Sequence, residues 1–267
     1  MSSPDSPIDV LCTPDFTAPS RARIAIPATW DQGRGLFGGL VTGILTRALE
    51  SSAPDRPLRS LTAEICGPVQ PGEALLELEV LRAGNAVTTT AIRLVQSGEV
   101  QAHGVGVLGT ARGAGTDRVD LVPPPRTRWQ DAPVLGMPAQ LQPGFAKHLE
   151  FRMTGPLPFS SGPAGVVEGW MRFAHPGERR DAAYLAACID SFWPALYTTL
   201  AAPRPMATIA FTFQPFLRAD RPLGDEPLRY RARLAAAHDG YCVEMRELWH
   251  ADGYLVALNQ QTMVVIK

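Results

Sequence analysis

The sequence lacks an excess of charge of either sign. Its 267 residues carry 25 basic and 26 acidic side chains, which gives a formal net charge of -1 at pH 7. Proteins that bind nucleic acids or anionic membrane surfaces usually concentrate basic side chains. The charge balance therefore predicts neither kind of partner, although it leaves room for a local basic pocket that holds a phosphorylated small molecule.

Long hydrophobic runs are missing as well. No segment approaches the roughly 18 consecutive apolar residues of a membrane-spanning helix, and the N-terminal stretch MSSPDSPIDVLCTPDF has no basic region followed by an apolar one. Hydrophobic residues nevertheless make up 45% of the chain, which is enough for a sizeable core. We therefore expect a soluble, cytoplasmic protein with no membrane partner.

Spacings typical of metal sites and of serine hydrolases are absent. The four cysteines and five histidines are dispersed without CxxC, HxxxH or HExxH spacing, so we expect reduced thiols, no bound metal and no cofactor. The segment closest to a GxSxG nucleophile motif is Phe159-Ser160-Ser161-Gly162, which lies in a Pro- and Gly-rich turn. Hydrolysis through an activated serine is therefore not predicted.

Helix and strand patterns occur in nearly the same order in the two halves of the chain. In the first half, periodicity predicts a strand, a helix and four strands, at 22–28, 38–50, 61–69, 74–82, 87–96 and 100–108. In the second half it predicts two strands, a helix and four strands, at 148–153, 165–173, 183–200, 207–216, 228–236, 241–250 and 254–266. We expect the glycines of the first helix to lie where another backbone comes close.

Short sequence motifs repeat along with this pattern. Residues 61–68 (LTAEICGP) parallel 208–215, and residues 96–102 (QSGEVQA) parallel 251–257. A long helix wrapped by a curved antiparallel sheet is the hotdog arrangement, and here the unit occurs twice. The predicted fold is therefore α+β, a tandem double hotdog.

The same comparison divides the chain into four parts. We expect a disordered N-terminal tail at 1–20 and a first hotdog repeat at 21–110. A Pro- and Gly-rich linker or crossover segment follows at 111–145, where no period is sustained. The second hotdog repeat occupies 146–267.

One acidic residue stands out in the second repeat, in the apolar stretch AACIDSFWPAL. Asp190 lies there among Cys188, Ile189, Phe192 and Trp193. Burying an ionised carboxylate without partners costs several kcal/mol, so this residue needs an explanation. It is either the N-cap of a helix or a catalytic carboxylate at the edge of an apolar pocket.

Three motifs carry a resemblance to a known family. The stretches Leu36-Phe37-Gly38-Gly39-Leu40, Leu81-Arg82-Ala83-Gly84-Asn85 and Asp252-Gly253-Tyr254-Leu255-Val256-Ala257, the last followed by Gln260-Gln261, resemble the acyl-CoA thioesterase II (TesB-like) double-hotdog family. The similarity runs from about residue 22 to residue 267. It implies hydrolysis of acyl-CoA thioesters, a reaction of fatty acid metabolism, to a free carboxylic acid and CoA.

The resemblance also implies site residues. The family uses an Asp, a Thr or Ser, and a Gln to hold a water, and the matching positions are Asp190, Thr208 and Gln261, with Gln260 as the alternative if the strand register slips by one. In hotdog enzymes a backbone N–H near the start of a central helix polarises the thioester carbonyl. Gly38 and Gly39 are the candidates for that role.

The two repeats differ at the matching positions. Gln261 aligns with Gly106, and the helix of the first repeat has no acid where the second has Asp190. The resemblance and this difference together place the chemistry in the second repeat. Thioester hydrolysis without a serine or cysteine nucleophile needs a water, a carboxylate to accept its proton, and polar groups to orient it.

Several alternatives stay open at this stage. One is a hotdog hydratase or dehydratase acting on an enoyl or hydroxyacyl thioester, and another is a non-catalytic acyl-CoA-binding protein. The length and type of the acyl chain, the carrier (CoA or acyl carrier protein) and the oligomeric state are not predicted, although a homo-oligomer fits the family. The arginines that could contact CoA phosphates are Arg34, Arg82, Arg179 and Arg180.

Overall fold

A single 12-stranded antiparallel sheet wraps around two central helices. The computed structural model describes residues 6–113, 115, 117–136 and 142–266. Its helices are α1 (Ile8–Leu11), α2 (Gly38–Ser51) and α3 (Ala182–Ile189), with short 3-10 turns η1 (Trp129–Asp131), η2 (Gly144–His148) and η3 (Ala195–Thr199). Its strands are β1 (Asp15–Ala18), β2 (Arg21–Ile26), β3 (Asp31–Gln32), β4 (Gly35–Leu36), β5 (Leu58–Ile65), β6 (Gly72–Ala83), β7 (Val87–Gln96), β8 (Glu99–Gly109), β9 (Leu149–Met153), β10 (Val166–Phe173), β11 (Met206–Pro215), β12 (Leu228–His238), β13 (Tyr241–Trp249) and β14 (Leu255–Val265).

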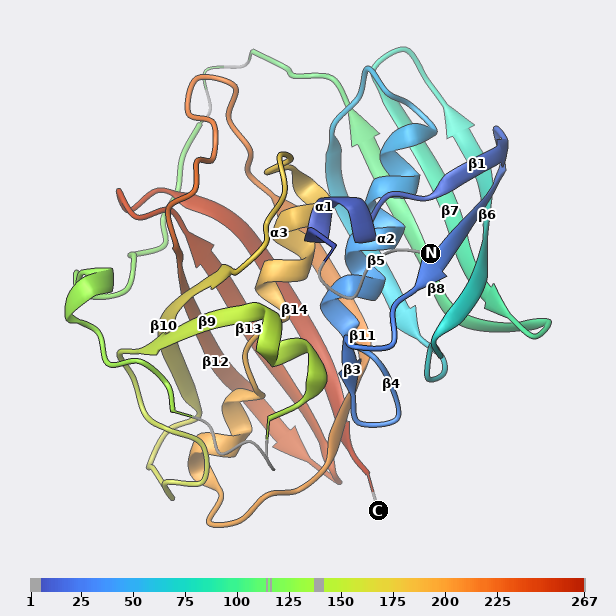
Figure 1. Ribbon diagram of the computed structural model, residues 1–267. Helices are drawn as coiled ribbons and strands as arrows, with labels where there is room; N and C mark the ends of the chain where they lie inside the picture. The colour runs from blue at the N-terminus through green and yellow to red at the C-terminus, as the bar shows by residue number, and fades with distance from the viewer. Residues whose placement is uncertain (1–5, 114, 116, 137–141, 267) are drawn as a thin grey trace.

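The two halves of the sheet meet at β5 and β11. The strand order is β1-β2-β6-β7-β8-β5-β11-β14-β13-β12-β10-β9, and Phe211 of β11 pairs with Ala63 of β5 at the junction. These are the strands whose sequences repeat, so each half supplies the same edge to a continuous sheet (Figure 1). The predicted double-hotdog architecture is confirmed.

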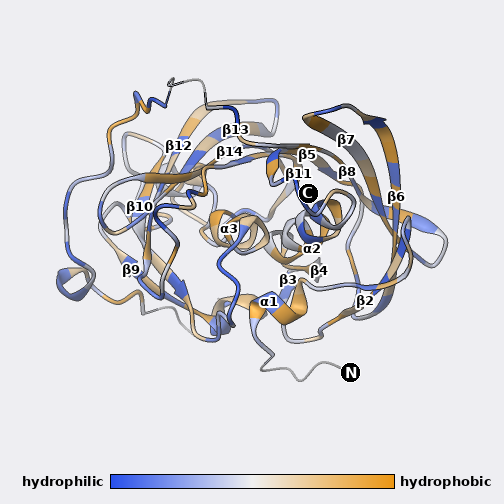
Figure 2. Ribbon diagram, turned by 90° about the horizontal axis from the view of Figure 1, so that it is seen from above, coloured by the Kyte–Doolittle hydropathy of each residue, from blue (hydrophilic) through white to orange (hydrophobic). Residues whose placement is uncertain are grey.

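The central helices lie side by side inside the curve of the sheet, as Figure 2 shows from above. A Cβ atom on Gly39 of α2 would lie 2.7 Å from the carbonyl oxygen of Ala187 in α3, and one on Gly43 would lie 3.1 Å from that of Ala183. The glycines therefore permit the close approach of the two backbones, which confirms the prediction for this helix. Because sheet and neighbouring helix surround α2, residues 39–49 are buried almost without interruption.

This packing gives a first prediction about stability. A Cβ on Gly43 would also lie 2.8 Å from Sγ of Cys12, so Gly43→Ala forces overpacking in a site that cannot expand. We expect the free energy of unfolding to fall by about 1 kcal/mol or more, even though alanine gains about 1 kcal/mol in helix propensity. Urea denaturation measures the change. Gly113→Ala, in open space, is the control, and equal stabilities for the two variants would contradict the packing account.

The N-terminal segment is ordered where the structure describes it. The expectation of a disordered tail at 1–20 is wrong for residues 8–11 and 15–18, which form α1 and β1, and residues 1–5 lie outside the described residues. Ile8 and Leu11 are buried, and the Asp9 carboxylate accepts hydrogen bonds from the backbone N–H groups of Glu178 and Arg179. A four-residue helix is too short to show a period, so only its burial beside α2 and α3 reveals it.

The predicted helix at 183–200 is also shorter than expected. Helix α3 ends at Ile189, and a 3-10 turn begins only at Ala195. Pro194 has no N–H and disfavours helical geometry in the residue before it, so the chain leaves the helix and re-enters a turn after the proline. The segment at 190–194 is therefore a loop, and it carries Asp190.

The linker region packs on the outer face of the second half of the sheet. Arg231 of β12 donates to the carbonyl oxygen of Val122 at 2.6 Å, and Arg229 donates to the carbonyl oxygens of Pro124 and Pro125. Alternation along β12 directs these arginines away from the face that carries Tyr230. The crossover chain is thus held by guanidinium–carbonyl hydrogen bonds, which no hydrophobic period would reveal. The division of the chain at 111–145 remains our proposal.

Candidate active site

Asp190 lies at the C-terminal end of α3. It is the C-cap residue, with φ -93° and ψ 0°, and its side chain is 7% exposed. The N-cap interpretation is therefore wrong for Asp190. The residue that caps α3 at its N-terminus is Asp181, whose side chain accepts a hydrogen bond from the backbone N–H of Tyr184. Asp190 needs another explanation for its burial.

The three polar residues taken from the family resemblance lie in one hydrogen-bonded chain. The Gln261 amide Nε2 donates to Oδ1 of Asp190 at 2.6 Å, and the Thr208 hydroxyl donates to Oε1 of Gln261 at 2.9 Å. Gln261 is fully buried, whereas Thr208 keeps partial exposure. The structure brings the three side chains together from the end of α3, β11 and β14.

Strand register decides between the two glutamines. Gln261 pairs with Glu244 on β13 and faces the helices, whereas Gln260 pairs with Met245 and points to the exposed side. Successive strand residues face opposite sides of a sheet. The glutamine that contacts Asp190 is therefore Gln261.

A β-bulge directs Thr208 toward the same face. Phe211 pairs with Gln261, so in a regular strand Thr208, three residues earlier, would point to the other side of the sheet. The register shifts between Thr208 and Ala210, so that Thr208 pairs with Met263. Met263 is two residues from Gln261 and faces the same, inner side of the sheet. One extra residue thus turns the hydroxyl toward Gln261, a common use of bulges beside functional sites.

The second carboxylate oxygen of Asp190 faces the start of α2. A Cβ on Gly38 would lie 2.6 Å from Oδ2, so the glycine permits this oxygen to approach the helix backbone closely. The N-cap residue Phe37 makes no side-chain cap. Its own N–H donates to the Trp30 carbonyl oxygen and the N–H of Leu40 donates to the Phe37 carbonyl oxygen, whereas the N–H groups of Gly38 and Gly39 have no carbonyl four residues back within the helix. They give this end of α2 a partial positive charge. Gly39, the other candidate, packs against Ala187 of α3.

Sequence reasoning missed two buried charges at this site. Arg246 donates to Oδ1 of Asp190 at 2.9 Å and pairs with Glu244 at 2.5 Å. Both lie on the inward phase of β13, where the stretch Cys242-Val243-Glu244-Met245-Arg246 places charged side chains at positions normally apolar. That inversion of the usual alternation is the signal that could have identified them.

Burial and charge act in opposite directions on Asp190. Burial raises the pKa of its carboxyl above the ordinary range, while the Arg246 charge and the Gln261 hydrogen bond lower it, and burial prevails. A buried carboxyl with a raised pKa is a better proton acceptor than an exposed one. These properties suit a general base.

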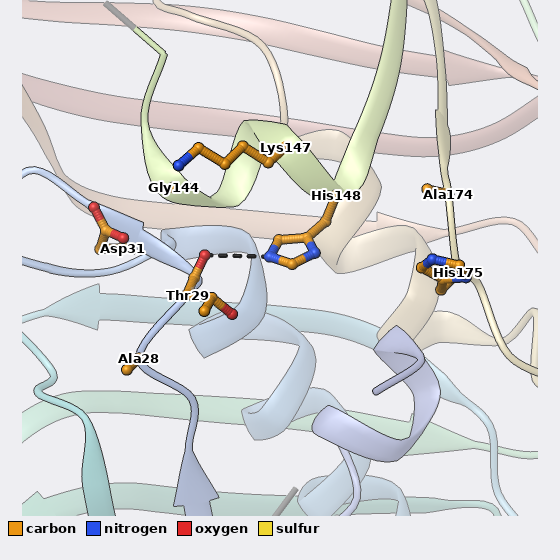
Figure 3. Close-up of a pocket in the computed structure, with 8 residues that line it drawn as sticks. All are labelled: Ala28, Thr29, Asp31, Gly144, Lys147, His148, Ala174 and His175. Carbon is orange, nitrogen blue, oxygen red and sulfur yellow. Dashed lines mark hydrogen bonds between the residues drawn. The ribbon is translucent and has the colours of Figure 1, made fainter. Parts of the chain in front are cut away.

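A separate surface hollow lies elsewhere in the described part of the chain. Figure 3 shows a surface cleft of about 430 Å³ lined by Ala28, Thr29, Asp31, Gly144, Lys147, His148, Ala174 and His175. The His148 ring stacks on Trp30, and its Nε2 lies 3.2 Å from the Thr29 carbonyl oxygen. Asp190 is not among the residues that line this cleft, and we base the candidate site on Asp190, where polar side chains converge.

The candidate CoA arginines do not line this cleft. Arg34, Arg82 and Arg179 are exposed, and Arg180 pairs with Asp225 at 2.6 Å.

Within the described residues there is no group of three or more His, Cys, Asp or Glu side chains that could hold a metal ion. No helix in that part of the chain is long and apolar enough to cross a membrane. The four cysteines are free thiols.

Solved structures share this architecture. A conserved protein of unknown function with a hotdog fold from Alicyclobacillus acidocaldarius matches with TM-score 0.89 and 24% identity, over 97% of this chain and 98% of that one. An acyl-CoA thioesterase II TesB2 from Mycobacterium marinum matches with TM-score 0.76 and 20% identity, over 97% and 98%. A tesB protein from Mycobacterium avium subspecies paratuberculosis gives 0.77 and 14%, over 97% and 98%. At these identities the likeness establishes the fold, a double hotdog.

Family models carry the assignment further. Residues 26–111 match the acyl-CoA thioesterase N-terminal domain, and residues 120–265 match the acyl-CoA thioesterase C-terminal domain. The chain belongs to the acyl-CoA thioesterase (TesB-like) double-hotdog family. Curated protein sequences contain no significant match.

Proposed function

We propose that this protein hydrolyses acyl-CoA thioesters to a free carboxylic acid and CoA, using a water activated by Asp190. Membership of the acyl-CoA thioesterase family supports the substrate class. The observation that carries the proposal is that the two carboxylate oxygens of Asp190 have different contacts. Its Oδ1 accepts from Gln261 and Arg246, while Oδ2 takes no part in these bonds and lies against Gly38 at the start of α2.

The reaction begins with a water beside Oδ2. The water oxygen attacks the thioester carbonyl carbon while one of its protons passes to Asp190. The carbon–sulfur bond of the tetrahedral intermediate then breaks, and the departing thiolate takes that proton. The products are a carboxylic acid and a free thiol, and the carboxylate of Asp190 is regenerated.

Neighbouring groups orient the reacting atoms. Gln261 fixes the plane of the Asp190 carboxylate, and the partly exposed Thr208, which donates its proton to Gln261, keeps its oxygen lone pairs for the water. The first-turn N–H groups of α2, Gly38 among them, stabilise the negative charge that develops on the carbonyl oxygen. The second repeat thus supplies the base, and the first supplies the helix end.

The hydratase alternative is less well supported. That chemistry calls for a histidine paired with an Asp or Glu, close to the substrate carbon that loses or gains a proton. Three histidines are engaged away from Asp190: His103 lies 3.1 Å from Glu64, His148 contacts the Thr29 carbonyl, and His250 lies 3.5 Å from Asp252.

A substrate panel tests the proposed function. We expect the wild type to release free thiol from acyl-CoAs. Comparing the rates for short, long and aryl chains reports the size and shape of the acyl pocket. Comparing the same acyl group on CoA and on acyl carrier protein identifies the preferred carrier. Loss of enoyl-CoA absorbance without thiol release would favour a hydratase instead. Tight binding of acyl-CoA with no thiol release would establish a binding protein.

A further inference from the structure

Arg246 and Glu244 enclose the loop that carries Asp190. The Arg246 guanidinium, 2% exposed, donates to Oδ1 of Asp190 at 2.9 Å and to the Ile189 carbonyl oxygen at 3.2 Å. Glu244, fully buried, accepts from Nε of Arg246 at 2.5 Å and, through Oε2, from the backbone N–H of Ala195 at 2.6 Å. One ion pair on β13 therefore holds both ends of the loop.

The loop needs such a support because it has no regular structure of its own. Helix α3 has ended at Ile189, and the next turn begins at Ala195. Within the described residues, the other side-chain hydrogen bond to the Asp190 carboxylate comes from Gln261. A catalytic carboxylate must keep its orientation closely, and a displacement of about 1 Å can reduce a rate by about 100-fold.

The ion pair also distributes charge. One guanidinium is shared by two carboxylates, Asp190 and Glu244, so the cluster is not neutral when all three groups are ionised. Arg246 favours the ionised form of Asp190, and Glu244 opposes it. The neighbouring phenol of Tyr230 on β12 stays neutral, since burial raises its pKa well above the ordinary value. Gln261 on β14 is uncharged, and α2 presents only its N-terminal dipole.

We propose that Arg246 and Glu244 are positioning residues that set the orientation and the basicity of Asp190, with opposite electrostatic effects. Arg246 holds the carboxylate and keeps it ionised, whereas Glu244 prevents complete neutralisation and keeps it basic. The catalytic meaning of this pair rests on the proposed hydrolysis, but its effect on the carboxyl group does not.

Titration of Asp190 tests the pair directly. Carbon-13 label at the aspartate carboxyl carbons is followed by NMR across pH in the full-length protein, and the Asp190 signal is assigned by its loss in Asp190→Asn. We expect Arg246→Met to raise the pKa of Asp190 by about 1 pH unit or more, and Glu244→Gln to lower it. The acid limb of the thiol-release pH profile is expected to move in the same two directions.

A third variant covers the risk that Arg246→Met does not fold. Arg246→Lys keeps the positive charge, but its single nitrogen cannot replace both Nε, which contacts Glu244, and Nη1, which contacts Asp190 and Ile189. We therefore expect a pKa near that of the wild type and a lower kcat with little change in KM. Shifts of the Asp190 pKa in opposite directions support the proposal. An unchanged Asp190 pKa in Glu244→Gln, together with an unchanged kcat in Arg246→Lys, would overturn it. Shifts of the Asp190 pKa in the same direction in Arg246→Met and Glu244→Gln would also overturn it. If the wild type releases no thiol, the hydrolysis proposal fails, and the NMR titration still decides this one.

Discussion

Replacing Asp190 with asparagine is expected to lower kcat/KM for thioester hydrolysis by about two orders of magnitude or more, with the fold retained. The asparagine oxygen can still accept from Arg246 and Gln261 as Oδ1 does, so the local hydrogen bonds survive. What is lost is the proton acceptor on the side of Gly38. Thiol release at several pH values measures the effect.

Stability should not fall along with activity. Because burial raises the pKa of Asp190 above the ordinary range, ionisation of this carboxyl lowers the free energy of unfolding as pH rises through that pKa. Asparagine removes this cost, so the melting temperature of Asp190→Asn is expected to equal or exceed that of the wild type at neutral pH. The control is Asp239→Asn, at a side chain that is 81% exposed, which should change neither property. Wild-type turnover in Asp190→Asn would leave Asp190 with a structural role only.

The second large effect on kcat is expected from replacing Gln261, with its neighbour Gln260 as the comparison. Gln261→Ala is expected to reduce kcat by about 10- to 100-fold, because the carboxylate of Asp190 loses the amide that fixes its plane and Thr208 loses its acceptor. Gln260→Ala, one residue earlier on the same strand but facing outward, should leave kcat unchanged. Parallel kinetics of the two variants make the comparison. Equal losses would show that disturbing β14, rather than removing one amide, accounts for the effect.

Much of the fold was predictable because its elements are locally encoded. The strand predicted at 87–96 matches β7 residue for residue, and most other strands agree within a few residues. Alternating side chains and glycine-containing turns give strong local signals there. The two misread regions lacked such signals. Helix α1 is too short to show a period, and the apolar run after Ile189 hides a loop that Pro194 alone indicates.

The candidate site was predictable only in part. Sequence similarity indicated Asp190, Thr208 and Gln261, and the structure brings these three side chains together. The choice between Gln260 and Gln261 needed strand register, and the direction of Thr208 needed a bulge, and neither is readable from residue types. Arg246 was missed because its partners come from the end of α3, which is distant in sequence.

A crystal structure of Asp190→Asn with an intact acyl-CoA tests the central claim most directly. The account predicts that the thioester carbonyl carbon lies beside the substituted side chain at position 190, with its oxygen toward the first-turn N–H groups of α2 at Gly38 and with Thr208 nearby. A thioester bound instead in the cleft that contains Lys147 and His148, away from position 190, would contradict it.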